Sequence, residues 1–221
     1  MNRTPLTLSL IVTCAHAGWN AQARTPPMSW RSWNQYGCNV SQPDIVANAR
    51  ALADTSRLVN GVPTSLASLG YVSAGLDDCY QELLDPSCVY PGFGGGEQPR
   101  FEVAAATAAA PPKGPPYTQH DDNGRPVVNR TRFPNLLEMT TQIHSLGLQA
   151  GFYQNNCFCR DHCGSAECYL GDTDALLDFD FDSVKYDGCG AADGNLTFYG
   201  TLLNNSAKAA NMIMENCNVS E

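Results

Sequence analysis

The chain has 221 residues, of which 43% are hydrophobic and 16% are charged. This apolar content excludes a disordered chain and suffices for one sizeable core or two small ones. Twenty-two acidic residues outnumber 13 basic ones, and the formal net charge of -9 disfavours a nucleic-acid partner. No apolar run reaches the roughly 20 residues that span a bilayer, so we expect no membrane partner either.

The first 23 residues have the pattern of a secretory signal peptide. Arg3 precedes a short apolar stretch, and residues 21–23 (Ala-Gln-Ala) fit an A-x-A cleavage site, with residues 15–17 as a second option. A buried N-terminal strand is the alternative. We therefore expect residues 24–221 to form one mature domain that is secreted or retained in the endomembrane system.

Strand-like and helix-like stretches then alternate, which is typical of an α/β protein. Strands are predicted at residues 28–34, 71–76, 148–153, 183–186 and 212–215. Between them we predict a helix after a capping box at Ser41 and Asp44, a short helix that ends at Gly70, a helix at 136–146 capped by Gly147, a helical turn at 175–179, and a helix at 196–203.

A long segment between the second and third strands lacks this pattern. Residues 92–96 are rich in glycine, 104–110 in alanine and 111–116 in proline. We predict a low-complexity surface insertion at about residues 85–126.

Five β–α units with polar strand ends predict a (β/α)8 TIM barrel. Because such barrels take about 250 residues, we expect this one to be truncated after about five strands.

Carboxylates follow three of the predicted strands: Asp77 and Asp78, Asp187, and Glu215. The carboxyl ends of parallel barrel strands open on one face, so these acids would converge there. The alternative is that they only begin the loops. Lys185 lies on the same side of its strand as Asp187, and a neighbouring carboxylate would keep it charged. This combination suits a polar sugar site.

Two tryptophans lie near the end of the first predicted strand. Trp30 and Trp33 either provide an apolar platform for a sugar ring or belong to the core.

Five motifs resemble glycoside hydrolase family 27, the α-galactosidase/melibiase family, and they occur in the family's order. They are Thr25-Pro-Pro-Met-Ser-Trp-Arg-Ser-Trp-Asn34, Leu76-Asp-Asp-Cys79, Arg132-Phe-Pro134, Gly147-Leu-Gln-Ala-Gly-Phe-Tyr153 and Val184-Lys-Tyr-Asp-Gly-Cys189. The resemblance implies a secreted or lysosomal retaining exo-glycosidase without a cofactor or metal. Its substrate would carry terminal α-linked galactose or N-acetylgalactosamine, and a homodimer is left open.

The resemblance also implies the roles of individual residues. The family's nucleophile falls on Asp187, while its substrate-binding positions fall on Trp33, Asp77, Asp78, Tyr153, Lys185 and Glu215. The family's acid/base follows the nucleophile by about 45 to 60 residues, on a sixth strand, and we expect it to be absent from this chain. Trp-Arg-Ser-Trp also replaces the family's usual Gly-Trp-Asn-Ser-Trp, so the contacts of the first strand are less certain.

Because of the missing acid/base, the rival interpretation is a secreted protein of the same fold that binds sugar without cleaving it. A third possibility is a fragment without an independent fold, whose open sheet edges would favour aggregation.

The cysteines and sequons agree with export. The chain has ten cysteines, nine of them after the predicted cleavage site. Five N-x-S/T sequons also follow that site, at Asn39, Asn129, Asn195, Asn204 and Asn218. The resemblance implies a Cys38–Cys79 disulfide and a bridge from Cys189 to one of Cys157, Cys159, Cys163 and Cys168. A zinc site formed by these cysteines with His162 is the less favoured alternative.

Overall fold

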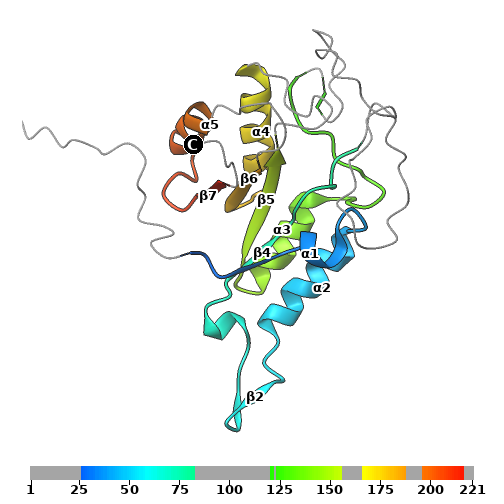
Figure 1. Ribbon diagram of the computed structural model, residues 1–221, viewed down its shortest axis with the longest axis vertical. Coiled ribbons are helices and arrows are strands. Elements are labelled where there is room, and N and C mark those ends of the chain that lie inside the picture. The colour runs from blue at the N-terminus through cyan, green and yellow to red at the C-terminus, as the bar shows by residue number, and fades with distance from the viewer. Residues whose placement is uncertain (1–25, 83–119, 122, 156–165, 188–195, 217–221) are drawn as a thin grey trace, which may run out of the picture.

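The computed structural model describes residues 26–82, 120–121, 123–155, 166–187 and 196–216. Among these residues, five parallel strands form one sheet, and their order follows the chain (Figure 1). They are β1 (Ser29–Arg31), β4 (Ser73–Gly75), β5 (Gln149–Asn155), β6 (Ser183–Asp187) and β7 (Ile213–Asn216). Parallel neighbours in sequential order, joined by helical crossovers, are the topology of a (β/α)8 barrel. The predicted class, an α/β barrel truncated after about five strands, is confirmed: the described residues form five parallel strands in barrel order.

The crossovers hold the helices on one side of the sheet. α1 (Trp33–Tyr36) and α2 (Gln42–Ala53) follow β1, α3 (Leu136–Ser145) precedes β5, α4 (Ala166–Asp178) precedes β6, and α5 (Leu196–Asn204) precedes β7. The predicted cap of α2 is present: the Asp44 carboxylate accepts hydrogen bonds from the backbone N–H and the hydroxyl of Ser41. Before β4, the short 3-10 helix η1 (Ala67–Leu69) ends at Gly70, as predicted.

Two predicted elements had the wrong length. The first strand ends at Arg31 rather than at residue 34, because Trp33 already begins α1. The turn expected at residues 175–179 is the end of α4, which has 13 residues. α4 escaped prediction because its first turns contain Gly171, Asp172 and Thr173, which interrupt the apolar periodicity of a helix.

A two-stranded hairpin was not predicted at all. β2 (Leu58–Val59) and β3 (Val62–Pro63) pair in antiparallel fashion around Asn60 and Gly61, whose φ angles are 52° and 80°. Asn-Gly is the favoured pair for this turn because both positions need a positive φ.

The end of the predicted insertion is packed rather than on the surface, which corrects its boundary. His120 is 3% exposed, Gly124 and Pro126 are buried, and His120 forms a β-bridge with Pro126. The turn at 121–125 lies against α4, where a Cβ on Gly171 would overlap the carbonyl of Gly124. Packing against this helix orders residues that have no apolar periodicity of their own. The rest of the predicted insertion lies outside the described residues.

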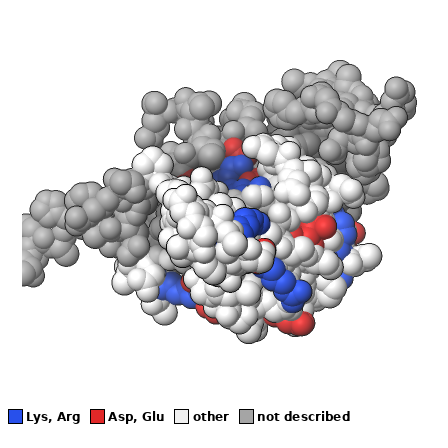
Figure 2. Space-filling view, turned by 90° about the horizontal axis from the view of Figure 1, so that it is seen from below, with Lys and Arg blue, Asp and Glu red and all other residues white. Residues whose placement is uncertain are grey.

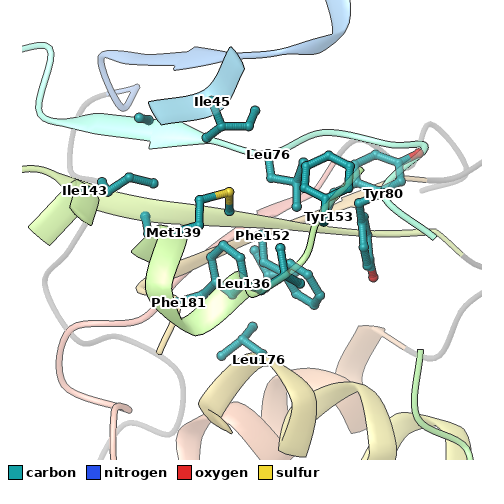
Figure 3. Close-up of a cluster of buried hydrophobic side chains, with 14 of the residues drawn as sticks. Ile45, Leu76, Tyr80, Leu136, Met139, Ile143, Phe152, Tyr153, Leu176 and Phe181 are labelled. Atoms are coloured by element: carbon teal, nitrogen blue, oxygen red, sulfur yellow. The ribbon is translucent and has the colours of Figure 1, made fainter. Parts of the chain in front are cut away.

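The main core fills the space between the sheet and its helices. Phe152 of β5 stacks on Phe181 with ring centroids 4.5 Å apart, and Tyr80 lies 4.9 Å away on its other side. Figure 3 shows this cluster with Met139 of α3 and Leu176 of α4 closing over it. Burial of such aromatic side chains supplies much of a domain's stability, so the sheet is held firmly behind the site described below.

Trp30, which could have been either a sugar platform or a core residue, packs against this core. Its ring meets Tyr36 edge-on, with centroids 6.3 Å apart. Trp30 is therefore a core residue, and only Trp33 remains a candidate for the site.

Seen from below in Figure 2, basic and acidic side chains lie interspersed among mostly uncharged surface. In a separate network, Lys208 pairs with Asp180 and Asp182, and His144 Nε2 lies 2.7 Å from Asp182. Within the part of the chain that the structure describes, no helix combines the length and apolar character needed to cross a membrane.

Candidate active site

Three of the predicted site residues lie side by side in one row across the sheet. Tyr153 of β5 is the Cα partner of Lys185 of β6, and Lys185 is the partner of Glu215 of β7. Partners on adjacent parallel strands point to the same face, about 5 Å apart. This is the inner face of the sheet, opposite the helices. Asp187 lies one step further along β6 on the same face, at the carboxyl end of the strand.

The row continues toward the first strand. Arg31 and Gly75 are Cα partners on β1 and β4, and Gly75 is the partner of Gly151 on β5. Trp33 and Asp77 follow Arg31 and Gly75 by two residues, as Tyr153 follows Gly151. The register of β5, β6 and β7 and the contact of Lys185 with Asp77 thus bring residues from four strand ends to one level, while Trp33 begins α1 directly after β1.

Lys185 is the centre of the charges in this row. Its Nζ lies 3.1 and 3.2 Å from the two carboxylate oxygens of Asp77, 3.6 Å from Asp187 Oδ2, and 5.1 Å from the centre of the Tyr153 ring. The Tyr153 hydroxyl donates a hydrogen bond of 3.0 Å to Asp187 Oδ2. Two carboxylates and an aromatic face therefore hold one ammonium group, as the position of Lys185 on its strand led us to expect.

The two acids after β4 are held in place by the backbone around them. Asp77 and Asp78 are 2% and 1% exposed. The Asp77 N–H donates to Ser32 Oγ at 3.0 Å, and the Asp78 N–H donates to Asp77 Oδ1 at 3.0 Å. The Cys38–Cys79 disulfide, which the resemblance implied, joins this loop to the chain after α1. Asp187, by contrast, keeps 30% of its side chain exposed, so its carboxylate is accessible.

Glu215 occupies its predicted place but has a partner that was not foreseen. Arg31 grips its carboxylate with two hydrogen bonds, from Nε at 3.0 Å and from Nη2 at 2.7 Å. In the sequence, Arg31 stands out only as a departure from the usual motif of the family that the chain resembles. The available signal was its place next to Trp30 in the first predicted strand: neighbours in a strand point to opposite faces, so a core position for Trp30 puts Arg31 on the inner face.

Several predicted residues can be placed only in part. Cys168 is disulfide-bonded, while Cys157, Cys159, His162, Cys163 and Cys189 lie outside the described residues. Of the sequon asparagines, Asn39 and Asn204 are exposed and Asn129 is half-buried, while Asn195 and Asn218 lie outside the described residues.

A second polar cluster lies on the opposite face of the sheet, and sequence reasoning missed it. His120 Nε2 lies 2.7 Å from Asp172 Oδ1, with both side chains almost fully buried near Tyr199. Burial raises the pKa of Asp172 against the opposing pull of His120. The pKa of Tyr199 is raised well above its ordinary value by burial and by the nearby Asp172. This cluster anchors the 120–126 segment rather than contributing to the inner-face site.

Comparison with known proteins agrees with this geometry. The family described as Alpha galactosidase A matches residues 116–219. Alpha-galactosidase 3 of Arabidopsis thaliana is 29% identical over 173 residues, which cover 77% of this chain and 30% of that protein. The chain spans about a third of the length of the curated relatives it matches.

Solved structures show the same fold. α-Galactosidase I from Mortierella vinacea superimposes with a TM-score of 0.58 at 24% identity, covering 89% of this chain and 42% of that one. An α-galactosidase from Saccharomyces cerevisiae, solved with raffinose, has a TM-score of 0.59 at 20% identity, covering 91% of this chain and 37% of that one.

Proposed function

The chain belongs to glycoside hydrolase family 27, the α-galactosidase/melibiase family, and we propose that it carries the nucleophile and sugar-binding part of an α-galactosidase site. The observation that supports this most directly is the cluster of Asp187, Lys185, Asp77 and Tyr153 on the inner face. Its substrate would be a carbohydrate with a terminal α-linked galactose. The α-galactosidases among its relatives, one of them solved with raffinose, support that substrate class.

In this proposal Asp187 is the nucleophile of a retaining displacement. Tyr153 and Lys185 both approach its Oδ2, so we assign the attack on the anomeric carbon to Oδ1. The ammonium group of Lys185 lies 3.6 Å from Oδ2 of this carboxylate, and the attack requires the ionised form. As the new carbon–oxygen bond forms, the bond to the leaving group breaks and its electron pair departs with the leaving oxygen.

The other members of the row hold the sugar. Asp77 and Asp78 are buried, fixed acids that accept hydrogen bonds from hydroxyl groups, and the half-buried Trp33 offers apolar surface to the ring. A retaining mechanism also needs a second carboxyl about 5–5.5 Å from the nucleophile to act as acid and base. We assign no described residue to that role.

We also propose that the protein is exported and glycosylated. The Cys38–Cys79 disulfide suits an oxidising compartment, and the exposed side chains of Asn39 and Asn204 are accessible to the glycosylation machinery. Peptide mapping of the native protein before and after enzymatic deglycosylation tests the sites. An unmodified Asn39 and Asn204 would contradict this proposal.

The test of the catalytic proposal uses 2,4-dinitrophenyl α-D-galactopyranoside. Its leaving group needs no protonation, so Asp187 alone suffices for the first displacement. We expect a burst of dinitrophenolate that is stoichiometric with the protein, together with a mass increase of one hexosyl unit. Asp187→Asn should slow the burst by at least about 10³-fold, as loss of a nucleophile does elsewhere.

The matched control is Asp178→Asn, the same change on the outer surface of α4, where Asp178 pairs with Arg125. It should leave the burst unchanged. A burst that survives Asp187→Asn would overturn the assignment of the nucleophile. Galactose binding without any burst from the wild-type chain would favour the rival, a sugar-binding protein without catalysis.

A further inference from the structure

The inner face of the sheet has an unusual floor beneath the row of site residues. At the level below the row, β4 and β5 carry Gly75 and Gly151, and β6 carries Ser183. Barrel interiors are usually filled with branched apolar side chains at such levels. Here the side chain of Arg31 lies over both glycines instead: a Cβ on Gly75 would be 2.9 Å from Arg31 Cγ, and one on Gly151 would be 3.3 Å from its Nη2.

The guanidinium group of Arg31 is engaged on both sides by the protein itself. Nη1 donates to the carbonyl oxygens of Leu76 and Phe152, each at 3.1 Å. Nε and Nη2 donate to the two carboxylate oxygens of Glu215. A guanidinium has five N–H donors, and these contacts use four of them. Arg31 is therefore well suited to hold another residue and poorly suited to bind an anionic ligand.

Glu215, in contrast, keeps capacity to bind a ligand. Each carboxylate oxygen has two lone pairs, and the grip of Arg31 uses one on each oxygen. The side chain remains 23% exposed and lies next to Lys185 in the row. Its orientation is set by a two-point contact, which a single charge would not provide.

We propose that Arg31 is a positioning residue of the sugar site, which lies under the row and holds the Glu215 carboxylate in the orientation that accepts one sugar hydroxyl. This inference rests on the proposed function, because it needs a sugar in the site. Arg31, on the first strand, would then influence which sugars bind by orienting Glu215, without contacting the sugar itself.

The experiment measures the affinity of the full chain for D-galactose and for its monodeoxy derivatives by calorimetry. In the wild type, removal of the hydroxyl that donates to Glu215 should weaken binding by about tenfold or more, because a partly buried charged acceptor loses its partner. Glu215→Gln and Arg31→Met should both reduce that discrimination to within about threefold, and the double variant should lose no more than either single variant.

Two further variants separate geometry from charge. Arg31→Lys keeps the positive charge without the two-point grip, so discrimination should fall as in Arg31→Met. Gly75→Ala alters no charge, but its Cβ would lie 2.8 Å from Arg31 Nη1 and displace the guanidinium. It should likewise reduce discrimination. Arg50→Met, on the exposed face of α2, is the matched control and should change nothing.

The outcomes distinguish this inference from the function beneath it. If the wild type binds none of the sugars, the proposed function and the inference both fail. If the wild type discriminates and folded Arg31→Met or Arg31→Lys does so equally well, only the inference fails, and Arg31 serves stability alone. Circular dichroism establishes whether each variant is folded. If Arg31→Met does not fold, the discrimination measured with Arg31→Lys tests the positioning role.

Discussion

The contact between α4 and the turn at residues 121–125 predicts an inverted response to a simple substitution. Glycine inside a helix normally costs stability, and its replacement by alanine gains up to about 1 kcal/mol. At Gly171 we expect the opposite sign. An alanine Cβ there would overlap the carbonyl of Gly124 and lie 2.8 Å from the Arg125 nitrogen.

The turn cannot easily move away. The Asp121 N–H donates to the Arg125 carbonyl at 2.8 Å, and the Arg125 N–H donates to Asp121 Oδ1 at 2.9 Å. The buried contact between His120 and Asp172 holds the same segment to α4. An extra carbon in a packed interface costs about 1–3 kcal/mol, and a clash with backbone belongs at the upper end of that range.

Subtracting the helical gain leaves Gly171→Ala less stable by about 1–2 kcal/mol. For a chain of this length, the melting temperature should fall by about 2–8 °C. Urea unfolding followed by circular dichroism measures the free energy, and a thermal scan measures the melting temperature.

The matched control is Gly200→Ala in α5. Among the described residues, a Cβ at Gly200 would meet only Met214 Cε, at an ordinary 3.8 Å. This variant should gain up to about 1 kcal/mol, since nothing opposes the helical preference of alanine. If Gly171→Ala were stabilised as much as Gly200→Ala, the packing of the turn against α4 would be wrong.

Two other predictions concern single contacts. Because burial raises the pKa of Asp172, the folded chain keeps a proton on this carboxyl at pH values just above the ordinary pKa of 3.8, where the unfolded chain has lost it. The resulting stabilisation is present at low pH and declines as the pH rises from about 4 toward the raised pKa, by up to about 1.4 kcal/mol per pH unit. Urea titrations across that range should show the decline in the wild type but not in Asp172→Asn. Asp44→Ala removes the carboxylate that caps α2 and should lower the free energy of unfolding by about 1 kcal/mol. The same urea titrations measure this loss, and Asn48→Ala, which leaves the cap intact, serves for comparison.

The sequence predicted the strand ends well because local chemistry determines them. Apolar runs that stop at Asp77, Asp187 and Glu215 define both the strands and their polar ends, and parallel topology then places the acids on one face. The roles of these acids still came from the resemblance to a family rather than from their spacing.

Features that depend on packing between distant segments were less predictable. The first turns of α4 are helical because Tyr169 and Asp172 are buried against neighbours far away in the chain, one of which is His120. The Asn60-Gly61 hairpin is different, since its turn signal was present in the sequence and was overlooked. No local sequence pattern indicates which carboxylate pairs with Arg31.

The contact between Arg31 and Glu215 also bears on when the site comes into being. The two residues are 184 positions apart, at the first and last of the described strands. Such a contact closes a very long loop, and non-local contacts of this kind are slow to form because chain entropy opposes them. We expect the Glu215 carboxylate to adopt its working orientation only after every intervening βα unit has docked. Binding competence would then be acquired in the last step of folding, and fraying of either edge strand would abolish it before the core unfolds.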